Sequence, residues 1–327
     1  MKNIKLTLLT ITLLSIGHLT HAQDAHFSQY YANPLYLNPA FAGSQICPRA
    51  TLNYRNQYPV LGVYQTYSAS YDQYVDGLNG GLGVLVVRDE AGNGALQTTE
   101  ASAIYSYHLK VSRKFTLLAG FQATYRERAI NWSGLTFPDQ IDPYYGFVLE
   151  SSQNRPPSEV NRHLDVSAGV LGFTERFYFG ASFHHLTQPE EQFFKTSKLP
   201  LKITGQAGFT IPLGRQRIHN ELQNFLIPNV VYQRQGSFDQ LTLSTAFSRG
   251  AISGGLGFRT STANPDAVVV LLGYTPTESA WKIGYSYDIT ISTQANSLGG
   301  AHEISLAYQF PCRVRKKKNE AIKCPKF

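Results

Sequence analysis

The strongest constraint in this sequence is an alternation of apolar and polar residues that recurs along most of the 327-residue chain. In residues 115–126, for example, one set of alternate positions is apolar or aromatic, namely Phe115, Leu117, Ala119, Phe121, Ala123 and Tyr125. A period of two puts successive side chains on opposite faces of a β-strand, whereas an amphipathic helix repeats every ~3.6 residues. The pattern therefore predicts an all-β protein whose strands have one apolar and one polar face.

Runs of this kind predict fourteen strands. They cover residues 49–57, 63–72, 80–88, 95–109, 115–126, 163–173, 177–185, 200–211, 226–233, 238–247, 252–260, 267–274, 280–290 and 302–310. Their lengths approach the roughly 9–11 residues that cross a bilayer at a tilt, and single-chain outer-membrane barrels have even strand numbers. We expect a transmembrane antiparallel β-barrel of about 14 strands over residues 49–310.

The connections between these strands differ in length on the two sides of the predicted barrel. Even-numbered strands are followed by short links, at residues 73–79, 110–114, 174–176, 248–251 and 275–279. The long links 127–162 and 186–199 follow odd-numbered strands, as expected for short periplasmic turns and longer extracellular loops. Residues 212–225 are too long for a minimal periplasmic turn, which predicts a small folded element or a miscounted strand there.

Aromatic residues gather near the periplasmic ends of the even-numbered strands, where an interfacial girdle would lie. They are Tyr71, Tyr107, Phe209, Phe247, Tyr274, Tyr308 and Phe310. Phe173 lies at the same level but is out of phase with the apolar face of its strand. The last strand presents one apolar face that ends on an aromatic residue, and it looks like a barrel assembly signal formed by Ile304, Leu306, Tyr308 and Phe310.

Residues 1–22 have the organisation of a secretory signal peptide, with a basic start, an apolar centre and a small residue at the end. We expect cleavage between Ala22 and Gln23, because the apolar centre is too short to span a bilayer as a helix. Residues 23–48 would then form an N-terminal periplasmic or luminal segment. Its aromatic residues and two Asn-Pro pairs predict that it packs in the lumen or against the periplasmic rim.

The charged residues predict a lumen that is plugged or narrow. The charged residues at strand positions that should face the lumen carry both signs. They are Glu100, His108, Arg126, Lys202, Lys282, Asp288 and Glu303. Mixed charges favour a hydrogen-bonded network over a single-sign channel filter. The net charge of +7 comes from the two ends of the chain, so no nucleic-acid partner is expected. The basic tail, residues 311–327, is interpreted as a solvated periplasmic segment or a contact for an acidic partner.

The three cysteines allow a disulfide, because an exported protein can form one. Cys47 precedes the first predicted strand and Cys312 follows the last, and these strands are neighbours in a closed barrel. We therefore predict a bond between Cys47 and Cys312. A bond between Cys312 and Cys324, or three unpaired thiols, remain the alternatives at this stage.

The sequence offers no catalytic, cofactor-binding or metal site, so we predict that the protein is not an enzyme and needs no cofactor. Serine-hydrolase, zinc-protease, redox-cysteine and dinucleotide motifs are missing. The glycines within residues 80–83 and 254–257 are interpreted as strand glycines that let side chains of neighbouring strands pass. His184 and His185 would point to opposite faces of a strand and thus share no metal. A barrel hydrolase is a remaining alternative.

The block from Gln23 to Gly43 resembles the opening of the PorP/SprF family of type IX secretion system membrane proteins. Further blocks are similar to that family, at residues 47–49, 53–57, 135–140, 285–288, 302–306, 312 and 322–325. The resemblance implies a barrel in the outer membrane of a Gram-negative bacterium. It also implies three kinds of partner: outer-membrane lipid, a secreted adhesin or other type IX substrate recognised through its C-terminal domain, and periplasmic or outer-membrane type IX components.

These observations favour a barrel that binds or anchors a secreted surface protein and supports its export or display, in some systems for gliding motility. The predicted binding element is a loop such as the aromatic and proline-rich residues 127–162, or the rim of the barrel. The main alternative is a passive diffusion porin, which would conduct steadily in planar bilayers. A soluble exported β-sandwich is the remaining alternative, and it would stay in solution without detergent.

Overall fold

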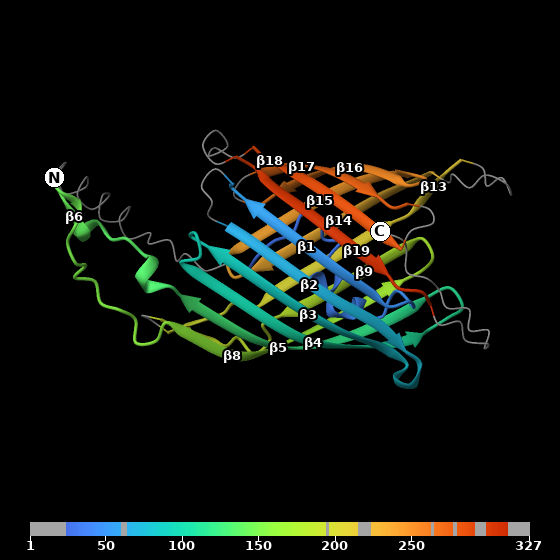
Figure 1. The fold of residues 1–327 in the computed structure, drawn as a ribbon. Coiled ribbons are helices and arrows are strands. Elements are labelled where there is room, and N and C mark those ends of the chain that lie inside the picture. The colour runs from blue at the N-terminus through green and yellow to red at the C-terminus, as the bar shows by residue number, and fades with distance from the viewer. Residues whose placement is uncertain are drawn as a thin grey trace, which may run out of the picture.

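The computed structural model describes residues 24–59, 64–193, 196–214, 224–262, 265–276, 280–291 and 299–312. Fourteen antiparallel strands form a closed ring, in which every strand pairs with two neighbours (Figure 1). The last strand, β19 (Ala301–Gln309), pairs with the first, β1 (Arg49–Gln57), along nine residue pairs. Closure pairs the backbone groups that an open sheet edge would expose to lipid, so the sheet can span a membrane.

The other ring strands follow in chain order and confirm the prediction of a transmembrane antiparallel β-barrel of about 14 strands. They are β2 (Tyr64–Val75), β3 (Gly80–Ala91), β4 (Leu96–Lys110), β5 (Thr116–Ile130), β8 (Val160–Phe173), β9 (Phe177–His184), β12 (Lys202–Phe209), β14 (Asn224–Gln235), β15 (Phe238–Arg249), β16 (Ile252–Thr260), β17 (Pro265–Tyr274) and β18 (Trp281–Thr290). Each predicted strand corresponds to one of them. Among the described residues, no helix is long and apolar enough to cross a membrane.

One end of the barrel, here called the short-turn end, carries the links after β2, β4, β8 and β15. The other, the long-loop end, carries residues 131–159 and residues 185–201. Residues 131–159, here called the long loop, project away from the barrel and hold η3 (Trp132–Gly134), η4 (Pro138–Gln140), β6 (Ile141–Asp142) and β7 (Gly146–Phe147) (Figure 1). Residues 185–201 contain the hairpin of β10 (Glu190–Gln192) and β11 (Thr196–Lys198).

The unusual link at residues 212–225 does not change the strand count. The short strand β13 (Ile211–Leu213) follows β12 almost directly and pairs with β14, which also pairs with β12. It therefore extends an existing pairing instead of adding a fifteenth strand to the ring. Residues 215–223 lie outside the described residues.

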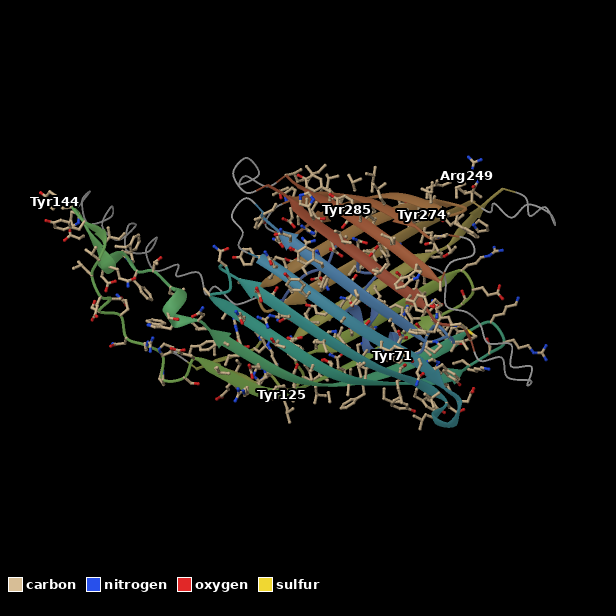
Figure 2. The ribbon with its side chains drawn as sticks, in the orientation of Figure 1. Tyr71, Tyr125, Tyr144, Arg249, Tyr274 and Tyr285 are labelled. Carbon is tan, nitrogen blue, oxygen red and sulfur yellow. A yellow bond between two sulfur atoms is a disulfide. The ribbon has the colours of Figure 1, made fainter. Side chains whose placement is uncertain are left out.

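The two faces of the barrel wall have the polarity that the alternation predicts. On β5, Phe121 and Tyr125 are exposed on the outside, whereas Gln122 and Arg126 are buried inside. The predicted girdle residues Tyr71, Tyr107, Phe209, Phe247, Tyr274 and Phe310 are likewise exposed, and Figure 2 shows Tyr71, Tyr125, Tyr274 and Tyr285 on the outer wall. Phe173, the out-of-phase aromatic, points inward and is buried. Apolar exposure of this kind suits contact with lipid.

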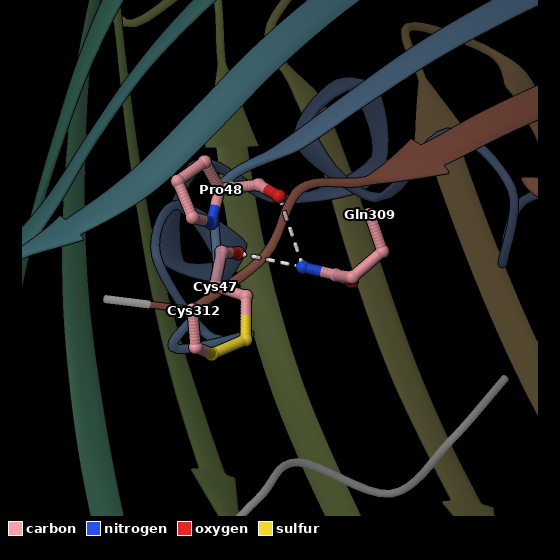
Figure 3. Close-up of a disulfide and its surroundings, with 4 residues drawn as sticks. All are labelled: Cys47, Pro48, Gln309 and Cys312. Carbon is pink, nitrogen blue, oxygen red and sulfur yellow. Dashed lines mark hydrogen bonds between the residues drawn. A yellow bond between two sulfur atoms is a disulfide. The ribbon is translucent and has the colours of Figure 1, made fainter. Parts of the chain in front are cut away.

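A disulfide joins Cys47 to Cys312 at the short-turn end, next to the seam between β1 and β19 (Figure 3). The Gln309 side-chain amide donates to the Cys47 and Pro48 carbonyl oxygens over 2.8 and 3.0 Å. The Phe310 backbone amide donates to the Pro48 carbonyl oxygen over 2.9 Å. These contacts join the residues just before β1 to those at and just after the end of β19, at the short-turn end of the barrel.

Peptide mapping of oxidised protein should therefore recover a cross-linked pair containing Cys47 and Cys312. Replacing Cys47 by Ser should lower the free energy of unfolding by about 2–4 kcal/mol, because a bond that closes a long loop restricts the unfolded chain. Urea unfolding in detergent measures this change. Cys324→Ser is the matched control and should leave stability unchanged, whereas a Cys312–Cys324 peptide would contradict the pairing.

Candidate functional site

The interior of the barrel is occupied by residues 24–48, here called the luminal segment (Figure 1). Most of its apolar side chains are buried, including Phe27, Tyr30, Leu35, Leu37, Ala40, Phe41 and Ala42. Two short helical turns, α2 (Pro34–Leu37) and η1 (Pro39–Phe41), each begin at the proline of an Asn-Pro pair. Proline suits the first position of a helix because its φ is already helical there.

The carboxyl-terminal half of the luminal segment packs against apolar side chains of the wall, among them Leu85, Ile104, Leu118, Leu171, Phe173 and Tyr178. Its backbone also touches the wall directly. A Cβ atom on Gly81 would overlap the Ala42 carbonyl oxygen, and one on Gly120 would overlap the Ala40 amide nitrogen. The interpretation of Gly81 as a glycine that lets a neighbouring side chain pass is therefore wrong. The missing side chain of Gly81 makes room for the backbone of the luminal segment.

The amino-terminal half is held by a buried ionic group, here called the seam cluster, that consists of Ser28, Arg55, Arg259, Asp288 and Glu303. Arg55 on β1 lies directly opposite Glu303 on β19, and their side chains meet at 3.2 Å. Arg55 and Arg259 each contact an Asp288 oxygen at 2.8 Å. The Ser28 amide donates to Glu303 over 2.7 Å, and its hydroxyl donates to Asp288 over 2.7 Å. Two arginines, two carboxylates and the luminal segment are thereby joined in one buried network, in which only the buried atoms Arg55 Nε and Asp288 Oδ1 have no hydrogen-bond partner among the described residues.

A second group, here called the mouth cluster, lies at the long-loop end and consists of Asp24, Glu100, Arg126, Asp165, His185 and Lys202. The two His185 ring nitrogens each lie 2.7 Å from a carboxylate oxygen, one of Asp24 and one of Asp165. Arg126 also contacts Asp24, at 3.2 Å. The amino end of the luminal segment is therefore tied to the wall by its own carboxylate.

His185 is charged in this arrangement. Burial alone would lower the pKa of His185, but the attraction of Asp24 and the hydrogen bonds to Asp165 and Asp24 outweigh burial and raise it to about 9. Burial would likewise raise the pKa of Asp24, yet His185 and Lys202 hold it well below its ordinary value. A cation and an anion therefore face each other across the junction between wall and luminal segment at neutral pH.

The structure corrects the sequence interpretation of the two adjacent histidines. Both His184 and His185 are buried inside the barrel, whereas strict alternation placed them on opposite faces. The reason is local: β9 ends at His184, and His185 has a left-handed backbone with a φ of 61°. Within the described parts of the chain, no group of three or more His, Cys, Asp or Glu could hold a metal ion.

Five of the seven predicted luminal charges lie in these two clusters, namely Glu100, Arg126, Lys202, Asp288 and Glu303. His108 contacts the Ala42 carbonyl oxygen at 3.1 Å instead. The sequence analysis missed Ser28, Arg55, Arg259 and Asp165. The last three lie at inward-facing positions of predicted strands, so the alternation could have identified them. Ala22 and Gln23, like Cys324, lie outside the described residues, and the assembly role of Ile304, Leu306, Tyr308 and Phe310 stays a prediction.

The long loop presents a second candidate site beyond the rim of the barrel. Tyr144 lies at its tip (Figure 2). Tyr144 and Tyr145 are 93% and 80% exposed, and the neighbouring Phe147, Val148 and Leu149 are exposed too. The tip is nevertheless structured. The Asp142 carboxylate accepts hydrogen bonds from the Tyr144 and Tyr145 backbone amides over 2.7 and 2.9 Å, which fixes the turn between β6 and β7.

Comparison with known proteins gives one family and several similar folds. The family described as type IX secretion system membrane protein PorP/SprF matches residues 19–308. The CymD monoaromatic hydrocarbon channel is 10% identical, with a TM-score of 0.48 over 85% of this chain and 93% of its own. The P. putida toluene transporter TodX is 12% identical, with a TM-score of 0.45 over 84% and 92%. The Acinetobacter baumannii protein Omp33 is 10% identical, with 0.43 over 82% and 100%. No curated protein sequence matches the chain.

Replacing Arg55 by Met should strongly destabilise the barrel. The variant leaves Asp288 and Glu303 with less compensation inside the wall, and loss of one partner from a buried ion pair costs about 3–5 kcal/mol. Arg88→Met is the matched control, because the Arg88–Glu90 pair is exposed and worth less than about 1 kcal/mol. Urea unfolding in detergent compares the two, and equal losses would contradict the importance of the seam cluster.

The tie between Asp24 and His185 should weaken at alkaline pH. The folded pKa of about 9 lies above the ordinary value of 6.5, so the contribution of His185 is complete below 6.5 and is lost as the pH rises through about 9. A protease added to the folded protein should cleave the luminal segment slowly at neutral pH and faster above pH ~9.5. His185→Gln should be cleaved fast at both values. His302→Gln, at an exposed histidine, should behave like the unchanged protein.

Proposed function

The chain belongs to the PorP/SprF family of type IX secretion system membrane proteins, and from this premise we propose that it anchors a secreted type IX substrate at the cell surface. It is a barrel of the Gram-negative outer membrane. The proposed role is non-enzymatic: the barrel binds the secreted protein through that protein's C-terminal domain and supports its export or display. Gliding motility would be served where the bound protein is a gliding adhesin.

The observation that carries this proposal is the exposed apolar tip of the long loop. Longer loops of outer-membrane barrels face the outside of the cell, so the tip would point away from the membrane. Tyr144, Tyr145 and Phe147 are too exposed to stabilise the loop itself. Contiguous exposed apolar side chains mark protein interaction sites, and tyrosines are frequent binding hot spots.

Charge adds a chemical description of the partner surface. The long loop contains four acidic residues, Asp139, Asp142, Glu150 and Glu159, and one basic residue, Arg155. An acidic, aromatic hairpin fits a partner surface with an apolar pocket and basic residues around it, because complementary charges favour the correct partner. We expect the C-terminal domain of the secreted substrate to present such a surface.

The filled lumen supports anchoring over conduction. Two cavities beside the luminal segment have volumes of about 10 and 20 Å³, which is about the space needed by single water molecules. Purified protein should therefore give no steady conductance in planar bilayers, compared with detergent alone. Steady conductance would favour the alternative of a passive diffusion porin.

Changing the two tip tyrosines should weaken partner binding without affecting the barrel. Tyr144→Ser combined with Tyr145→Ser should reduce affinity for the secreted substrate at least ~30-fold, because hot-spot residues contribute about 2 kcal/mol or more. Binding is measured by co-purification from outer membranes and then by titration with the purified substrate domain. The matched control is Tyr58→Ser combined with Tyr64→Ser, two tyrosines at the same end of the barrel but outside the long loop.

A loop replacement gives a second, more complete test of the same site. The Ile130 amide donates to the Glu159 carbonyl oxygen over 2.8 Å, so these residues already face each other at the base of the loop. Replacing residues 131–158 by Asn-Gly would close a two-residue hairpin there and leave the ring intact. Retention of the substrate by a correctly inserted barrel of this kind would contradict the proposal.

A further inference from the structure

The luminal segment crosses the lumen from one end to the other. At the long-loop end, the Asp24 amide donates to Gln235 over 3.1 Å, and Gln235 is the last residue of β14. At the short-turn end, the Gly43 amide donates to Asp72 over 2.9 Å, four residues before the disulfide at Cys47. The amino end of the segment therefore lies at the long-loop end, and its carboxyl end lies where β1 begins.

The segment has a fixed register inside the barrel. Halfway along it, the Asn38 side-chain amide donates to the Val170 and Ala181 carbonyl oxygens, each over 3.1 Å. A Cβ atom on Gly169 would overlap the Asn38 side-chain oxygen, so wall and segment are in direct contact. Polar contacts at the two ends and close packing between them prevent the segment from sliding along the barrel axis.

We propose that the amino terminus of the processed protein lies at the cell-surface mouth of the barrel, where it is accessible from outside. The inference rests on the predicted cleavage after Ala22 and on the outward orientation of the long-loop end. Asp24, the first described residue of the luminal segment, is itself a member of the mouth cluster, and the predicted cleavage leaves one residue before it in the sequence.

This location has two consequences. The first concerns assembly: the luminal segment runs through a closed ring, so its amino end must cross the whole lumen, either when β1 and β19 pair or by threading through an open end afterwards. The second concerns recognition. The mouth that carries the amino terminus is also the end from which the acidic long loop projects, so the partner that we propose would meet both on one surface.

Cysteine labelling of intact cells tests the location. In a Cys324→Ser background, Gln23→Cys should react with a membrane-impermeant maleimide, as should Asn154→Cys on the exposed part of the long loop. Arg113→Cys, in the short turn between β4 and β5, should react only after the outer membrane is permeabilised. N-terminal sequencing of the labelled protein establishes that cleavage has taken place.

Labelling of Gln23→Cys only after permeabilisation would overturn the inference, as would an amino terminus that follows a different residue. Gln23→Cys changes the predicted cleavage site and could impair processing, so a second variant keeps Gln23 and carries Gly-Ser-Cys between Gln23 and Asp24. Its labelling in intact cells should be as extensive as that of Asn154→Cys. The result is independent of partner binding. If the variant with Tyr144→Ser and Tyr145→Ser loses substrate binding while labelling at position 23 is unchanged, the two proposals are tested independently of each other.

Discussion

Closure of the ring between β1 and β19 is the constraint on which the other features depend. A backbone that crosses lipid cannot leave its amides and carbonyls unpaired, so the last strand must return to the first. Three kinds of interaction act on this seam. A ladder of nine residue pairs joins the strands, the Arg55–Glu303 pair joins them from inside, and the Cys47–Cys312 disulfide links their ends. Residues that are 244 to 265 positions apart in the chain are thereby held in one register.

The interior follows from closure, because inward-facing polar side chains need partners once water is largely excluded. The luminal segment supplies them as backbone amides and a hydroxyl at Ser28, and as a carboxylate at Asp24. Burying ion pairs adds little net stability compared with apolar packing, so we attribute specificity to the two clusters: they fix one depth and one direction for the segment. The apolar contacts of Leu35, Phe41 and Ala42 then provide the burial that favours the filled state.

The sequence predicts the wall well because a period of two is a local property. Each of the fourteen strands was found, and β1 and β16 have the predicted bounds. Other ends were set by a partner: β5 continues to Ile130 because it pairs with Leu96 on β4, which no local pattern reveals. The site was harder to predict. His185 has a left-handed backbone, so its side chain does not follow the alternation of the strand before it. The direction of the luminal segment depends on contacts between distant parts of the chain, such as that of Ser28 with Glu303, 275 positions away.

The long loop and the luminal segment meet on the same strand, an arrangement that fits the anchoring role proposed above. Arg126, tied to Asp24 inside the lumen, lies four residues before the end of β5, where the long loop begins. The base of the loop is further held by the Glu127–Arg162 pair at 2.7 Å and by the contact of Ile130 with Glu159. A binding loop on a rigid base loses less conformational freedom when a partner binds, so more of the contact energy contributes to affinity. In the proposed role, filling the lumen would serve the outer surface, because it fixes the wall from which the aromatic hairpin projects.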